Sequence, residues 1–123
     1  MELPSEVHGT FVQRKTLADV GVTLTSRGEF RFERDRFFEF DVREPMPSVF
    51  RATPTNYSVT VNGRTTSRAL DIDVTSIGRI FEIREMKEFV KSVKTEPETG
   101  FPRRVRVTFR NGDRLEIDLN AVP

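Results

Sequence analysis

Apolar and polar residues alternate over most of the chain, and this two-residue period constrains the fold more than any other feature. The alternation is strict over 29–33, 38–43 and 57–61. Successive side chains of an extended chain point to opposite faces, so each segment predicts a strand with one buried and one solvated face. Two Asn-Gly pairs, at 62–63 and 111–112, predict tight hairpin turns.

The C-terminal part of the chain predicts one antiparallel hairpin, because apolar residues alternate with charged ones on both sides of Asn111-Gly112. The alternating apolar residues are Val105, Val107, Phe109, Leu115, Ile117 and Leu119.

Other segments are less regular. Residues 9–15 predict a strand, and 17–24 form a looser stretch that Gly21 breaks. The polar run 25–28 predicts a turn. Pro45-Met46-Pro47 interrupts any ladder, since proline donates no backbone hydrogen bond. Leu70, Ile72 and Val74 continue the strand pattern.

One stretch has a helical period instead. Four apolar residues at positions i, i+3, i+4 and i+7 predict an amphipathic helix over Arg84–Val93; they are Met86, Phe89, Val90 and Val93. A loop is expected over Thr95–Gly100, which contains Pro97. A helix on one face of an antiparallel sheet buries both apolar surfaces. The sequence therefore predicts a mainly β fold in a single domain, residues 1–123: a strongly curved antiparallel sheet with about one helix packed on it.

Composition excludes several classes of protein. The 123 residues contain no cysteine and one histidine, which excludes disulfides, cysteine-ligated zinc, a thiol nucleophile and a multi-histidine metal site. The formal net charge is +1, without the clustered basic excess typical of nucleic-acid binding. No run of 18 apolar residues predicts a membrane span. The first six residues lack the basic and apolar regions of a signal peptide.

Few residues offer chemistry. His8 is expected at the surface, near the chain end. Glu39 with Asp41, and Asp71 with Asp73, share strand faces at i and i+2, an arrangement typical of a solvated sheet face. No calcium-loop spacing and no glycine-rich phosphate loop are present. We therefore expect neither an enzyme nor a protein with catalytic residues, a metal or a cofactor.

The C-terminal hairpin carries a basic face, which allows two interpretations. Its arginines could follow a phosphate backbone or an anionic lipid surface. We favour the second interpretation, in which Asp113, Glu116 and Asp118 pair with them across the sheet. The arginines are Arg103, Arg104, Arg106, Arg110 and Arg114.

Phenylalanine is the unusual component, with 11 residues against one tyrosine and no tryptophan. Six lie within 21 residues: Phe30, Phe32, Phe37, Phe38, Phe40 and Phe50. Such rings either form the core or line an apolar groove for an acyl chain, where each buried methylene contributes ~0.8 kcal/mol. The sequence alone leaves both possibilities open.

The segment from Gly9 to about Gly63 resembles the LolA family of periplasmic outer-membrane lipoprotein carriers. Residues 9–15, Gly-Thr-Phe-Val-Gln-Arg-Lys, are similar to that family's F-x-Q-x-K strand. Residues 28–34, Gly-Glu-Phe-Arg-Phe-Glu-Arg, resemble its glycine, alternating strand and arginine, and 37–40 its next aromatic strand. Pro45 occupies the position of the family's closing proline. More loosely, residues 101–103 and 111–119 resemble its final strands.

This resemblance implies an unclosed β-barrel in the periplasm that accepts acyl chains from an inner-membrane release complex and passes them to an outer-membrane receptor. Phe30, Phe32, Phe38 and Phe40, with Phe50, are then candidates to line the lipid site, although either pair of strand phenylalanines could face the other side. Arg34 matches the family arginine that holds a lid closed by hydrogen bonding. The alternative is a small β-rich protein-interaction module with no lipid ligand. Because an unclosed sheet exposes two edges, a homodimer is also expected, or a monomer only when lipid is bound.

Overall fold

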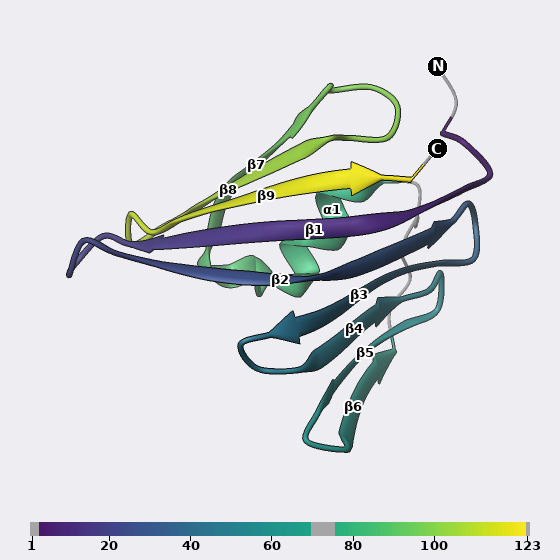
Figure 1. Ribbon diagram of the computed structural model, residues 1–123, viewed down its shortest axis with the longest axis horizontal. Helices are drawn as coiled ribbons and strands as arrows, with labels where there is room; N and C mark the ends of the chain where they lie inside the picture. The colour runs from purple at the N-terminus through teal and green to yellow at the C-terminus, as the bar shows by residue number, and fades with distance from the viewer. Residues whose placement is uncertain (1–2, 70–75, 123) are drawn as a thin grey trace.

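A computed structural model describes residues 3–69 and 76–122, which form one nine-stranded antiparallel sheet, one α-helix and one short 3-10 helix (Figure 1). The elements are β1 (Glu6–Leu17), β2 (Val22–Glu33), β3 (Phe37–Glu44), β4 (Ser48–Ala52), β5 (Asn56–Val61), β6 (Arg64–Ala69), α1 (Ile77–Arg84), the 3-10 helix η1 (Lys87–Phe89), β7 (Val90–Glu96), β8 (Arg104–Phe109) and β9 (Arg114–Ala121). The strands lie in the order β6-β5-β4-β3-β2-β1-β9-β8-β7, and the sheet is not closed. The predicted fold class is confirmed.

One face of the sheet carries the apolar side chains, and α1 packs on this face, which we call the inner face. Strand register aligns the apolar residues: Phe11 pairs with Leu119 of β9, and Phe30 of β2 pairs with Phe40 of β3. In Figure 1, α1 lies behind β1 and β2. Ile80 of α1 is fully buried in the same cluster as these rings. The core therefore lies between α1 and the inner face.

The predicted turns mostly match the structure. Asn62-Gly63 joins β5 to β6, and Asn111-Gly112 joins β8 to β9, so both hairpins are confirmed. Gly21 has a φ of +64° in the turn between β1 and β2, where the loose stretch was expected to break. The loop predicted to begin at Thr95 begins at Pro97, because β7 continues to Glu96. Leu70, Ile72 and Val74 lie outside the described residues.

The turn predicted over 25–28 is wrong, because these residues lie inside β2 and pair with β1. Gly28 marks an irregularity instead, since the register between β2 and β3 shifts between Arg27 and Gly28. A Cβ atom on Gly28 would clash with the carbonyl oxygen of Asp41 on β3. Glycine occurs here because β3 approaches closely.

The helix predicted over Arg84–Val93 is also wrong. The helix lies earlier, at Ile77–Arg84, and Val90–Glu96 forms β7. Met86 has a φ of +68°, which no α-helix accommodates, so the helix cannot continue through it. The i, i+3, i+4 pattern that is buried is Ile77, Ile80 and Phe81.

Candidate functional site

The candidate lipid-lining residues all lie on the inner face. Phe30, Phe32, Phe38 and Phe40 are at most 1% exposed, and Phe50 is 6% exposed. The first four rings form contacts among themselves: the centroids of Phe38 and Phe40 lie 4.7 Å apart, and those of Phe32 and Phe38 lie 5.6 Å apart. The ring of Phe50 lies 6.1 Å from that of Tyr57. We call these five residues the phenylalanine cluster. Both strand pairs thus face the same side, which the sequence left open.

Helix α1 covers the middle of the phenylalanine cluster. The ring of Phe81 lies edge-on to Phe40, with 5.1 Å between centroids, and 6.1 Å from Phe38. Ile77 and Ile80 are buried beside it. All three are apolar side chains, so their contacts with the cluster are non-directional.

Phe101, in the connection between β7 and β8, covers the cluster next to α1. Its ring stacks on Phe30 at 5.8 Å and lies 5.4 Å from Phe32. Phe101 was not among the predicted site residues. Its half-buried position closes the inner face between α1 and the end of β2.

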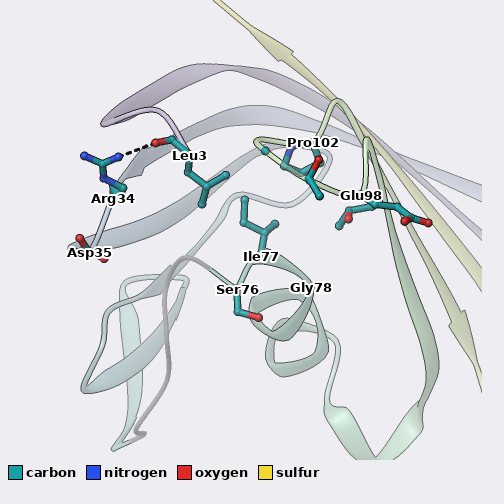
Figure 2. A pocket seen from close by; sticks show the side chains of 11 residues that line it. Leu3, Arg34, Asp35, Ser76, Ile77, Gly78, Glu98 and Pro102 are labelled. Atoms are coloured by element: carbon teal, nitrogen blue, oxygen red, sulfur yellow. Dashed lines mark hydrogen bonds between the residues drawn. The ribbon is translucent and has the colours of Figure 1, made fainter. Parts of the chain in front are cut away.

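An open cleft of about 720 Å³ lies where α1 begins (Figure 2). Its lining comes from the N-terminal segment, the β2–β3 turn, the start of α1 and the β7–β8 connection. Leu3 and Ile77 contribute apolar surface, while Arg34, Asp35 and Glu98 are its charged residues. The cleft therefore reaches the first turn of α1.

Arg34 lines this cleft and ties the N-terminal segment to the β2–β3 turn. Its Nη1 donates a hydrogen bond to the carbonyl oxygen of Leu3 at 2.8 Å, drawn as a dashed line in Figure 2. Its backbone N–H donates to the carbonyl oxygen of Ser5 at 2.9 Å. Asp35 follows in the turn with a φ of +64°. The residue predicted to hold a lid therefore holds the chain segment at the mouth of the cleft.

Arg84, at the end of α1, is the inner-face residue that sequence reasoning missed. Its Nη2 donates a hydrogen bond to Oε1 of Gln13 at 2.7 Å, and its guanidinium lies 4.8 Å from the centroid of Phe40. Nη1 is buried and lies 3.1 Å from Oε2 of Glu85 without hydrogen-bond geometry. Burial lowers the pKa of Arg84, and Glu85 opposes that shift. The sequence signal for a polar contact on the inner face was Gln13, which follows Phe11 by two residues on β1 and therefore faces inward.

The outer face carries ion pairs. Arg51 contacts Glu39 at 2.9 Å, and Arg43 contacts Asp41 at 3.0 Å, so this carboxylate pair lies on the solvated face as predicted. His8 is exposed, also as predicted. Asp71 and Asp73 lie outside the described residues.

The pairing predicted for the C-terminal hairpin is confirmed for two arginines. Arg104 bonds Asp118 at 2.8 Å, and Arg106 lies 3.3 Å from Glu116. The hydrogen bond from Arg104 lowers the pKa of Asp118. Asp113 is the exception, because its carboxylate accepts a hydrogen bond from the backbone N–H of Ala18 at 2.8 Å rather than pairing with an arginine.

Within residues 3–69 and 76–122, no three histidine or acidic side chains gather in a way that could hold a metal ion. No helix of this part of the chain is both long and apolar enough to cross a membrane. Neither family models nor curated proteins show a match to this chain.

Proposed function

We propose that this protein is a non-enzymatic carrier, which binds the acyl chains of lipoproteins or other lipids between its inner face and α1. The proposal rests on one observation, the apolar packing contact between α1 and the phenylalanine cluster. Three apolar side chains, Ile77, Ile80 and Phe81, hold the helix there, beside an open cleft at its first turn. Displacing α1 would expose aromatic rings to which an acyl chain can bind without directional bonds.

The energies of the two states are comparable. Exposing three large apolar side chains costs roughly 5–9 kcal/mol in total, and breaking the hydrogen bond between Arg84 of α1 and Gln13 costs about 1–3 kcal/mol more. Burying about ten methylenes of an acyl chain contributes ~8 kcal/mol. Because the ligand replaces contacts of similar strength, small additional interactions decide between loading and release. A carrier that must take up and hand over its cargo needs this near-balance.

A reversible cross-link between α1 and β7 tests the proposal. The chain has no cysteine, and a Cβ on Gly78 of α1 would lie 4.0 Å from Cγ1 of Val93 on β7, so side chains at these two positions are in van der Waals contact. The double variant Gly78→Cys/Val93→Cys is expected to bind a fluorescent fatty acid about tenfold or more weakly when oxidised than when reduced. The wild-type protein, treated with the same oxidant and reductant, is the control. Equal binding by both forms of the variant would contradict a carrier in which α1 moves.

Arg34 is expected to affect acyl exchange more than stability. Arg34→Leu removes the hydrogen bond that holds the N-terminal segment at the cleft, so fatty-acid exchange should become faster while the melting temperature stays within about 5 °C. Arg36→Leu is the matched control, because Arg36 lies in the same turn but pairs with Glu33 and does not line the cleft. Equal rates of fatty-acid exchange in both variants would show that Arg34 has no role in ligand release.

The location and route belong to the same proposal and rest on the resemblance alone. They comprise the periplasm, an inner-membrane release complex as donor and an outer-membrane receptor as acceptor. Native mass spectrometry of freshly purified protein would show co-purified fatty acid or phospholipid if cargo binds.

The second candidate, a protein-interaction module without a lipid ligand, is favoured by the near-complete burial of the phenylalanine cluster. All six residues of the edge strand β6 are exposed, so it could pair with another chain or with a second copy to form a homodimer. In that case lipid would not change the melting temperature, and light scattering would detect the dimer.

A further inference from the structure

The topology gathers one set of connections along one rim of the sheet, opposite the cleft. Antiparallel neighbours alternate direction, so the turns β1–β2, β3–β4, β5–β6 and β8–β9 share this rim, and η1 joins it (Figure 1). The backbone N–H of Arg110, in the β8–β9 turn, donates to the carbonyl oxygen of Phe89 in η1. Ala18, in the β1–β2 turn, bonds Asp113 of the β8–β9 turn. We call this edge the hairpin rim.

Most of the exposed apolar side chains lie on the hairpin rim. Of nine large apolar residues that are exposed in the described part of the chain, seven belong to it: Val20, Val22, Leu24, Met46, Val61, Met86 and Phe89. Leu24 is 52% exposed and Phe89 is 55% exposed. They come from four connections that are distant in sequence. Single exposed apolar residues are normal on a protein surface, whereas a concentration of them marks an interaction site.

Strand pairing places Leu24 and Phe89 at the same end of the inner face. Leu24 pairs with Lys15 of β1, and the Nζ atom of Lys15 lies 4.7 Å from the ring centroid of Phe109. Phe109 pairs with Val90, the neighbour of Phe89. The exposed residues of β2 and η1 therefore flank one end of the sheet.

Cations accompany these apolar residues. Five exposed basic residues of this region form no ion pair with any described residue: Arg64, Lys87, Lys91, Arg110 and Arg114. Asp19, Glu44 and Glu88 are exposed acidic residues there without an ion pair among the described residues, and Asp113 bonds the backbone of Ala18. Elsewhere on the sheet, arginines such as Arg43 and Arg104 pair with carboxylates. The hairpin rim thus combines exposed apolar tips with an excess of unpaired cations.

We propose that the hairpin rim docks the protein onto a bilayer that contains anionic lipids. Apolar tips on separate turns can each enter the boundary between headgroups and acyl chains, while lysine and arginine contact the lipid phosphates. A stable protein–protein interface instead needs a contiguous area of ~800 Å² per partner. The scattered origin of the tips therefore favours a membrane. This surface is separate from the cleft at the opposite rim, so docking goes beyond acyl-chain binding.

Vesicle flotation with matched variants tests this proposal. The wild-type protein is expected to float with vesicles of phosphatidylcholine and about 30% phosphatidylglycerol, and to bind less as salt screens the charges. Leu24→Ser and Phe89→Ser should each lower binding about fivefold, because each removes an inserted apolar side chain. Val122→Ser is the control, since Val122 is 53% exposed but lies beside His8 at the opposite rim, and it should bind as wild type does. Circular dichroism verifies that all three variants are folded.

Three results would overturn the proposal. The first is no flotation of the wild-type protein, and the second is an equal loss of binding in Val122→Ser and Leu24→Ser. The third is a dimer in light scattering that Leu24→Ser dissociates, because the rim would then be covered by a second copy. Fatty-acid binding in the absence of vesicles should be unchanged in Leu24→Ser. A failure of the carrier proposal is therefore recognised separately from a failure of membrane docking.

Discussion

Replacing Gly28 with alanine should strongly destabilise this protein. Gly28 pairs with Phe11 on β1 and lies where the β2–β3 register shifts. An added Cβ would clash with the carbonyl oxygen of Asp41 and lie 2.9 Å from Cε2 of Phe11. Since the carbonyl oxygen belongs to the backbone, no rotamer change can relieve the clash, and β3 itself must move.

The magnitude follows from the kind of contact. Overpacking a tight interior costs typically 1–3 kcal/mol, and a clash with backbone lies at the upper end, so we expect about 3 kcal/mol for Gly28→Ala. This is a large part of the 5–15 kcal/mol of total stability that is usual for a domain. For a chain of this length it lowers the melting temperature by roughly 10 °C.

Urea unfolding followed by circular dichroism measures the effect, with Gly78→Ala as control. Gly78 lies in α1, and the nearest atom to its added Cβ is Cγ1 of Val93 at 4.0 Å. That variant should gain about 0.5–1 kcal/mol from helix propensity. A free energy of unfolding for Gly28→Ala within about 0.5 kcal/mol of wild type would refute the close approach of β3 to β2.

Three further predictions concern other contacts. Gln13→Ala should lower stability by about 1–3 kcal/mol in urea unfolding, because it removes the hydrogen-bond acceptor of the buried Arg84 guanidinium; a neutral result would mean that water reaches Arg84. Arg104 lowers the pKa of Asp118 in the folded state. The stabilisation that Asp118 gives is therefore present above the pKa that its carboxyl has in the unfolded chain, and it is lost as the pH falls through the lower pKa of the folded state. Below about pH 4, stability should therefore fall less steeply in Asp118→Asn than in wild type, and equal slopes would contradict this coupling. Phe101→Ala should cost about 2 kcal/mol in thermal unfolding, since a half-buried ring loses its stacking on the cluster; no loss would show that the ring is not held there.

The strands could be predicted from sequence because the two-residue period reports burial directly. Glu29–Glu33 alternates along β2 as expected, since one face meets the core and the other meets water. The helix could not be placed, because η1 and β7 carry apolar residues whose spacing imitates a helical stripe. Met86 and Phe89 belong to that apparent stripe but are exposed, while Gly78 weakens the helical signal of the true helix.

The candidate site could be predicted only in part. Alternation put Phe30 and Phe40 on strands, but the cross-strand register decides that they share a face. Arg84 was missed because a buried arginine depends on partners far away in sequence, here Gln13 on β1. Phe101 was missed for a similar reason, since a loop residue carries no periodic signal that would reveal its contact with Phe30.

The strand order also determines how the chain can fold during synthesis. Among the described strands, the meander β1–β6 and the trio β7–β9 are joined within the sheet only by the β1–β9 ladder, which pairs Gly9 with Ala121 and Thr16 with Arg114. Strand β1 therefore completes its pairing only after β9 has been synthesised. Until then, β1 can pair with β2 but its other edge has no partner strand, and the neighbouring phenylalanines lack part of their cover. Such long-range closure slows folding and prolongs the exposure of an aggregation-prone strand, so early chain segments are the ones most in need of a chaperone.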